Sequence, residues 1–350
     1  MDRSDIQQNW TDHIEVALRK YEPYMVYTHE GIRGRPPKPE TPGPTGVVFV
    51  TSMRDTIIED QNGLIIDHNG RPYYMKGLIE AVNERINDRR SGLEHILRIK
   101  GIITDDSSTD NLMTDQESII PLVPQKGKPW LHPIDARDYN GELLIKNTHN
   151  IPSDFRSITP DAKDEREYKR LQFEEEVYRV SQQMGADILI SDHLMVKLIS
   201  LINTNRYSIG RVLNIHPGIS DLKNPNRLPG ATPTQDAIDR ASLGQIYRKR
   251  RGIYLPRKRD PHNKTGASLH IVDEGLDTGP VIADSESTPV YLSDTPQELR
   301  IRNYPVKTAV FIAGITHYIL TMIKEVDRLN FQGGERPESI KKVVKVQKFR

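Results

Sequence analysis

Cysteine is absent from this chain of 350 residues, which excludes disulfide bonds, thiol nucleophiles and cysteine-ligated metals. No apolar run approaches the roughly 20 residues that a membrane-spanning helix needs, and residues 1–5 lack the basic-then-apolar order of a signal peptide. Neither sign of charge predominates, because 49 basic and 48 acidic residues leave a net charge of +1. That balance implies no general attraction to nucleic acid or to a membrane. We therefore expect a cytoplasmic protein.

Short apolar runs alternate with helical patterns along the chain, which indicates parallel strands joined by helices. The expected strands cover residues 47–50, 97–104, 187–191, 212–215 and 268–272. The expected helices cover residues 78–86, 161–184 and 295–326, the last interrupted by Pro305, and Asn69-Gly70 predicts a small hairpin. Residues 105–160 show no clear pattern. The pattern predicts an α/β fold of the Rossmann-like kind, with a central, mostly parallel sheet flanked by helices.

Three segments stand apart from this pattern. Residues 1–45 combine a helical pattern with a proline-rich linker, and we expect either a packing arm or dimer contact, or a role at the functional site. Residues 331–350 are polar and basic and are expected to fray, which leaves residues 46–330 as the main folded domain. The basic insertion at 240–266 is interpreted as a solvated loop, with a nucleic-acid or anion grip and a lid over the site as alternatives.

Polar side chains gather at the ends of two of the expected strands. Asn214 and His216 are two residues apart on the strand at 212–215, so they point to the same face of an extended chain. Asp277 lies in the glycine-containing loop that follows the strand at 268–272. Taken singly, such a histidine or aspartate is more often structural than catalytic. Open α/β sheets place their sites at strand ends, so the three side chains are candidates for one site.

These residues belong to runs that resemble one enzyme family. The runs are Asn214-Ile215-His216-Pro217, Leu228-Pro229-Gly230 and the stretch 269–280, which reads LHIVDEGLDTGP. They resemble the folate-dependent formyltransferases, which transfer a formyl group from 10-formyltetrahydrofolate to an amine. The resemblance extends from about residue 47 to about residue 323 and is dense between residues 186 and 282. Residues 230–238 and 265–270 look most like the hydroxyornithine formyltransferases of siderophore assembly.

The resemblance implies a role for each candidate. Asn214 would donate its side-chain N–H to the oxyanion that develops on the formyl oxygen, and His216 would be a second donor, as an imidazolium. Asp277 would hold His216 and a water molecule and take the amine proton, directly or through that water. The implied cofactor-binding residues for 10-formyltetrahydrofolate are Leu194, Met195, Val196, Leu198, Val272, Asp273, Glu274 and Gly275. The candidate substrate-binding residues are Ser52, Arg54, Asp55, Gln235 and Asp236. The histidines show no paired-ligand spacing, so no metal is expected.

The acceptor implied by this resemblance is a small molecule, N5-hydroxyornithine. Residues 51–55 contain no glycine, which argues against a nucleotide phosphate held by a glycine-rich loop after the first strand. A sugar-nucleotide amine and glycinamide ribonucleotide stay open as acceptors, and so does hydrolysis of formyltetrahydrofolate with water as the nucleophile. An inactive folate-binding or nucleic-acid-binding module is a further alternative. The sequence does not indicate the oligomeric state.

Overall fold

The computed structural model describes sixteen segments of the chain, which together hold the sheet and its flanking helices. They are residues 44–51, 64–66, 72–74, 77–88, 91–105, 137–138, 140–159, 161–194, 196, 198–203, 210–230, 232–250, 253–258, 261–275, 277–323 and 347–349. The predictions of an N-terminal helix and a proline-rich linker fall outside these residues.

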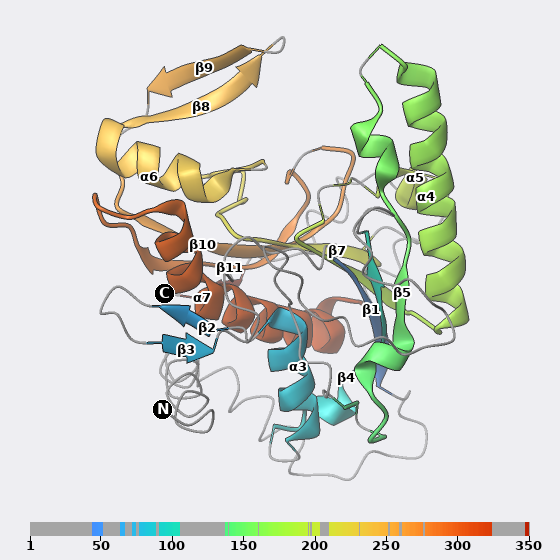
Figure 1. Ribbon diagram of the computed structural model, residues 1–350. Coiled ribbons are helices and arrows are strands. Elements are labelled where there is room, and N and C mark those ends of the chain that lie inside the picture. The colour runs from blue at the N-terminus through green and yellow to red at the C-terminus, as the bar shows by residue number, and fades with distance from the viewer. Residues whose placement is uncertain are drawn as a thin grey trace.

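A sheet of eight described strands forms the centre of the protein (Figure 1). Its order is β12-β11-β10-β7-β6-β1-β4-β5. From β7 to β5 all neighbours are parallel, whereas β10 runs antiparallel to both β7 and β11, and β12 lies parallel to β11. The strands are β1 (Thr45–Thr51), β4 (Leu97–Thr104), β5 (Thr148–Asn150), β6 (Ile188–Asp192), β7 (Val212–His216), β10 (Lys264–Ile271), β11 (Val281–Pro289) and β12 (Gln347–Phe349).

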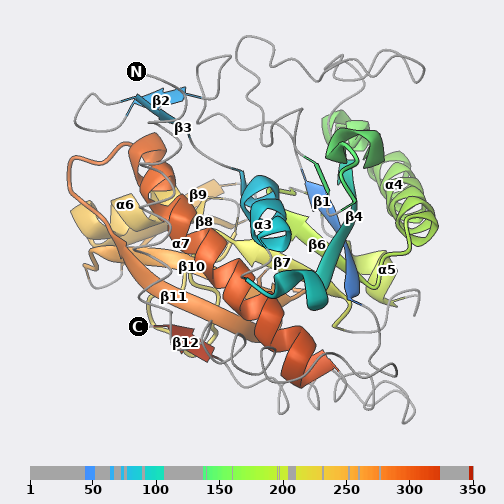
Figure 2. The ribbon, with the colours of Figure 1, turned by 90° about the horizontal axis from the view of Figure 1, so that it is seen from below.

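Helices cover both faces of this sheet (Figure 2). One face packs against α3 (Leu78–Asn87) and α7 (Pro296–His317), and the other against α4 (Lys163–Gln183) and α5 (Ile199–Asn203). Beside α7 lies α6 (Pro233–Leu243), and the hairpin of β8 (Gln245–Arg250) and β9 (Ile253–Lys258) extends beyond it. A second hairpin pairs β2 (Leu64–Ile66) with β3 (Pro72–Tyr74). Short 3-10 turns are η1 (Leu93–His95), η3 (Leu144–Asn147) and η4 (Asp154–Ser157), and α7 continues into a π-helical turn, Tyr318–Met322.

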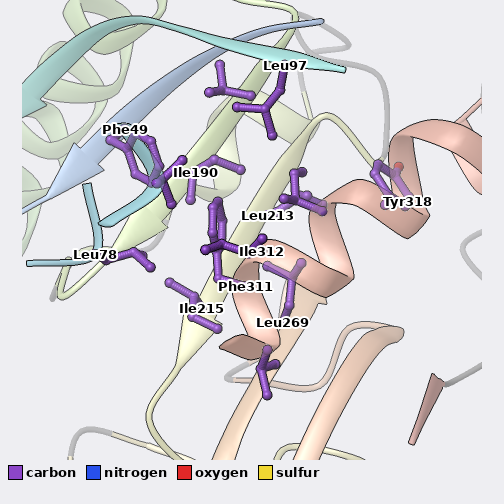
Figure 3. Packing of buried hydrophobic residues seen from close by; sticks show 14 of the residues in the cluster. Phe49, Leu78, Leu97, Ile190, Leu213, Ile215, Leu269, Phe311, Ile312 and Tyr318 are labelled. Atoms are coloured by element: carbon purple, nitrogen blue, oxygen red, sulfur yellow. The ribbon is translucent and has the colours of Figure 1, made fainter. Parts of the chain in front are cut away.

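Side chains of the central strands alternate between two hydrophobic clusters. In β1, Val47 and Phe49 face α3 and α7, whereas Val48 and Val50 face α4 and α5. Phe49 meets Phe311 of α7 with ring centroids 5.6 Å apart, in the cluster that Figure 3 shows. Because both faces of β1 are covered, its sequence is a continuous apolar run rather than an alternating one.

Most predicted elements are confirmed. The five expected strands lie in β1, β4, β6, β7 and β10, and the expected helices correspond to α3, α4 and α7. The end of α4 follows the sequence signal, since Gly185 has the left-handed φ of 72° that favours glycine after a helix. The segments on either side of Asn69-Gly70 pair as an antiparallel hairpin. The mostly parallel sheet with helices on both faces is the predicted Rossmann-like α/β architecture.

Three expectations were wrong. Pro305 does not interrupt its helix, because α7 runs continuously from 296 to 317; packing of this helix in the core outweighs the hydrogen bond that proline removes, a loss of about 3 kcal/mol. The C-terminal tail does not fray throughout, because residues 347–349 add strand β12 to the sheet. The basic insertion is not a simple loop, because β8 and β9 pair along six positions. No helix in the described part of the chain has the length and apolarity to cross a membrane.

Candidate active site

The alternation of β7 aims two polar side chains at one face of the sheet. Leu213 and Ile215 pack under α7 and α3, so Asn214 and His216 point to the opposite face. His270 of the neighbouring strand β10 lies directly opposite Asn214 in the antiparallel register. The pairing of two strands distant in sequence therefore brings an amide and two imidazoles together.

Asp277 joins them from the loop that follows β10. Its backbone is left-handed, with a φ of 50°, and its carboxylate oxygen Oδ2 accepts a hydrogen bond of 2.8 Å from the backbone N–H of Gly230. Arg227 donates from Nη2 to the Asp277 carbonyl at 2.9 Å, which holds the loop in place. The same Oδ2 lies 3.7 Å from His216 Nδ1. The predicted trio of Asn214, His216 and Asp277 is thus gathered in one place.

The carboxamide of Asn214 donates in two directions. Its Nδ2 lies 3.1 Å from His270 Nε2 and 3.4 Å from Asp277 Oδ1. His270 Nδ1 lies 3.0 Å from the carbonyl of Ile271, which can only accept, so the ring proton sits on Nδ1 and Nε2 is the acceptor for Asn214. One hydrogen of Asn214 is therefore committed to His270, and this directs the second toward Asp277.

His216 is oriented by a backbone carbonyl rather than by Asp277. Its Nε2 donates to the carbonyl of Leu228 at 2.8 Å, which leaves Nδ1 facing the site. Burial lowers the pKa of His216, although the nearby Asp277 charge opposes this shift, so the ring is neutral at neutral pH. The expected role as an oxyanion donor therefore requires that Nδ1 gain a proton during the reaction.

Asp277 remains ionised in this setting. Burial raises the pKa of its carboxyl, but its interactions with His270 and His216 and the hydrogen bond from the Gly230 N–H oppose burial. Their combined effect holds the pKa well below its usual range. At neutral pH the site therefore presents a carboxylate beside a neutral imidazole, and both can accept a proton.

A cavity of about 430 Å³ opens onto these groups. It is lined by Asn214, His216, His270 and Asp277 together with Leu194, Val196, Leu198, Val272, Asp273, Gly275 and Gln235. Of the other predicted site residues, Glu274 is exposed and Asp236 is buried in α6, and neither lines the cavity. Met195, Ser52, Arg54 and Asp55 lie outside the described residues.

His270 and Arg300 are among the cavity residues that the sequence analysis missed. His270 carries a usable signal, because it alternates with the buried Leu269 and Ile271 and so must share a face with its neighbours across the sheet. Arg300 of α7 also lines the cavity, but nothing in a helical pattern reveals which strand ends the helix passes. Within the described residues, no group of three or more potential ligand side chains is placed to hold a metal ion.

Comparison with known proteins agrees with this geometry. Residues 146–315, just under half of the chain, match the formyl transferase family, and that segment contains Asn214, His216 and Asp277. A solved structure described as PvdF of pyoverdin biosynthesis, an N10-formyltetrahydrofolate-dependent formyltransferase, superposes with a TM-score of 0.61 at 24% identity. The superposition covers 79% of this chain and 99% of that one. No curated protein sequence matches.

Two further structures are more distant. Glycinamide ribonucleotide transformylase 1 from Symbiobacterium toebii has a TM-score of 0.46 at 14% identity, over 82% of this chain and 93% of that one. A formyltetrahydrofolate deformylase from Pseudomonas putida has a TM-score of 0.39 at 17% identity, over 80% of this chain and 67% of that one. Residues 146–315 are therefore similar in sequence to the formyl transferases, and the chain shares its fold with the formyltransferase PvdF.

Proposed function

We propose that this enzyme transfers the formyl group of 10-formyltetrahydrofolate to the amine or hydroxylamine nitrogen of a small molecule, and that the acceptor is N5-hydroxyornithine. We assign the activity to residues 46–330. The observation that carries the proposal is the meeting of Asn214, His216 and Asp277 at the wall of a cavity of about 430 Å³. A carboxylate, an imidazole and an amide donor in contact are the groups that acyl transfer to an amine requires.

The cavity has a wall that suits the flat, largely apolar pterin of the donor. Leu194, Val196, Leu198 and Val272 line that wall, and the first three follow β6 in a single loop. The volume lies in the range of small-molecule sites, which are mostly apolar with a few polar groups that fix orientation. When bound there, the donor supplies an activated formyl group that the acceptor nitrogen attacks.

Asn214 stabilises the negative charge that develops on the formyl oxygen. Its contact with Asp277 is 3.4 Å long, beyond the usual range of strong hydrogen bonds. This N–H therefore readily leaves Asp277 and donates its hydrogen bond to the oxyanion instead. His270 keeps the other N–H of the amide and so preserves its orientation. Such a preoriented donor acts on the transition state without reorganisation.

Asp277 takes up the proton that the acceptor nitrogen loses as its bond to the formyl carbon forms. His216 Nδ1 lies 3.7 Å from Asp277 Oδ2, receives this proton from Asp277 and then donates a hydrogen bond to the oxyanion. As the bond from the formyl carbon to the donor nitrogen breaks, the proton passes to that nitrogen, so proton and charge balance over the cycle. A hydroxylamine suits this arrangement because it is less basic than an alkyl amine and is unprotonated at neutral pH.

The choice of N5-hydroxyornithine is supported by residues 230–238 and 265–270, which resemble the hydroxyornithine formyltransferases. The structural similarity to PvdF, described as an enzyme of pyoverdin biosynthesis, points the same way. Gln235, one of the candidate acceptor-binding residues, lines the cavity.

Mass spectrometry of acceptor products tests the proposal. The enzyme is supplied with 10-formyltetrahydrofolate and, in separate reactions, with N5-hydroxyornithine, ornithine, an amino-sugar nucleotide, glycinamide ribonucleotide or no acceptor. Asn214→Ala, His216→Ala and Asp277→Asn are assayed beside the wild type. We expect one added formyl group on N5-hydroxyornithine and a fall of at least about 100-fold in each variant.

Each other outcome contradicts a definite part of the proposal. Formylation of a different acceptor replaces the acceptor and keeps the mechanism. Release of tetrahydrofolate without an acceptor identifies a hydrolase. Wild-type rates in the three variants contradict the assigned chemistry.

A further inference from the structure

On the basis of the formyl transfer proposed above, we further propose that Arg227 is a positioning residue, which holds Asp277 where its carboxylate can pass a proton to His216. Arg227 lies in the segment 218–230 that follows β7, whereas Asp277 lies in the loop that follows β10. Arg227 is not among the described residues that line the cavity. It therefore acts on the reaction through Asp277 and not by contact with the substrates.

The guanidinium of Arg227 links the two loops that meet at the site. Its Nε donates to the carbonyl of Ser220 at 3.1 Å, within its own segment, and its Nη2 donates to the carbonyl of Asp277 at 2.9 Å, in the other loop. Because the guanidinium is planar and rigid, the position of one carbonyl determines that of the other. The strands β7 and β10 lie side by side (Figure 1), although Arg227 and Asp277 are 50 residues apart in the chain.

The segment that carries Arg227 is itself anchored to the sheet. The side chains of Asn224 and Asn226 donate to the two carboxylate oxygens of Glu286 in β11, at 3.2 and 2.7 Å. Arg227 follows directly after this anchor. Its bond to Asp277 therefore restrains the loop after β10 against a fixed frame.

The same segment supplies backbone groups that orient the trio. The carbonyl of Leu228 accepts a hydrogen bond from His216 Nε2 at 2.8 Å, and the Gly230 N–H donates to Asp277 Oδ2 at 2.8 Å. His216 and Asp277 are thus positioned relative to each other by one segment. Of these contacts and the bond from Arg227 to Asp277, only the last is made by a side chain of the segment, so a substitution can remove it and keep the backbone.

Asp277 needs such a restraint because its backbone is left-handed, with a φ of 50°. A residue with a side chain keeps this conformation only where the surrounding contacts hold it. Relaxation of the loop would move Asp277 Oδ2 from its place 3.7 Å from His216 Nδ1, and Oδ1 from its place 3.4 Å from Asn214 Nδ2. A displacement of about 1 Å at reacting groups can lower a rate about 100-fold.

The kinetics of Arg227→Met and Arg227→Lys test this role, each alone and combined with Asp277→Asn. The control is Arg302→Met, because Arg302 also donates to a backbone carbonyl, that of Pro289 at 2.9 Å, and does not line the cavity. The substrates are 10-formyltetrahydrofolate and N5-hydroxyornithine, or whichever acceptor the wild type formylates. Urea unfolding verifies that each variant is folded, and the lysine variant carries the comparison if the methionine variant is not.

We expect Arg227→Met to lower kcat by about 10- to 100-fold, with both KM values within about threefold of wild type, because the substrates do not contact Arg227. Arg227→Lys should lose less, since its ammonium replaces part of the guanidinium, and Arg302→Met should keep the wild-type kcat.

The combined variants separate positioning from a general effect on structure. In the Asp277→Asn background, the substitution of Arg227 should change kcat by less than about threefold, because the carboxylate that it positions is already absent. Losses that multiply in the combined variants, or an unchanged kcat in Arg227→Met, overturn the role of Arg227 and leave the transferase function in place.

Amide hydrogen exchange tests the restraint without relying on formyl transfer. The Gly230 N–H, which is bonded to Asp277, should exchange at least about tenfold faster in Arg227→Met than in the wild type. The Val272 N–H, which is bonded to the carbonyl of Val212, should exchange at the wild-type rate. If this difference appears in a protein that formylates no acceptor, the restraint is confirmed and the proposed function is wrong. Equal exchange rates at Gly230 reject the restraint whatever reaction the protein catalyses.

Discussion

Replacing Asn214 with alanine separates two effects of this side chain, one on stability and one on the transition state. In the resting enzyme the carboxamide makes a hydrogen bond of 3.1 Å to His270 and a longer contact of 3.4 Å to Asp277. Loss of the first should reduce the free energy of unfolding by about 1 kcal/mol, as for a typical neutral hydrogen bond. The second is too long to contribute much.

The effect on catalysis should be larger, because the N–H that is only weakly bonded to Asp277 in the resting enzyme is the one that donates to the oxyanion. Removal of one such donor costs about 10²–10³ in kcat, which corresponds to about 2.7–4 kcal/mol of transition-state stabilisation. The carboxamide does not contact the ground-state acceptor in this scheme. The loss should therefore appear in kcat, with KM values within a few-fold of wild type.

Steady-state kinetics with 10-formyltetrahydrofolate and the acceptor, together with urea unfolding, measure both effects. Asn303→Ala is the matched control, because Asn303 is a buried asparagine that donates to backbone carbonyls at 2.8 and 3.4 Å but does not line the cavity. The control should lose stability and keep kcat within about threefold. A kcat for Asn214→Ala within tenfold of wild type, or a loss confined to KM, refutes the assignment of Asn214 as the oxyanion donor.

Three further predictions concern stability. Glu174→Ala should lower the free energy of unfolding by about 2–4 kcal/mol in urea unfolding, because this buried carboxylate accepts N–H bonds from the start of α5; an unchanged midpoint contradicts this. Gly266→Ala should prevent normal pairing of β10 with β11, since a Cβ there lies 1.6 Å from the Ser285 carbonyl oxygen, and a wild-type melting temperature rules this out. Burial lowers the pKa of His216 from 6.5, so the unfolded chain binds this proton at higher pH than the folded protein. The stability that the neutral His216 ring contributes is therefore fully present above about pH 6.5 and is lost as pH falls through the pKa of the folded state. His216→Gln should flatten this part of the plot of melting temperature against pH, and parallel plots for the wild type and the variant contradict the lowered pKa.

The sequence was most informative where local pattern and tertiary packing agree. Residues 47–50 are apolar without alternation because helices cover both faces of β1, and the same reasoning holds for β6. Asn214 and His216 could be assigned to one face because the period of a strand is two residues. These signals are local, so they need no knowledge of neighbouring segments.

Contacts between segments that are distant in the chain could not be predicted from the sequence. The contact between Asn214 and His270 arises from the register of β10 against β7, two strands separated by about fifty residues of chain. Arg300 reaches the cavity through the path of α7 across the strand ends, which helical periodicity does not specify. Pro305 was overinterpreted because local propensity gives way to core packing in a long buried helix.

Two residues of the cavity wall have left-handed backbone angles, His193 with a φ of 54° and Asp277 with a φ of 50°. Glycine adopts such angles freely, whereas a side chain there costs about 1 kcal/mol. Glycine at either position would relieve this cost but would also remove a side-chain contact, that of His193 with Lys307 or that of Asp277 with the Gly230 N–H. The backbone shape of the cavity wall is therefore maintained by the side chains at its strained positions, so a substitution there changes both the shape of the cavity and the groups that it presents.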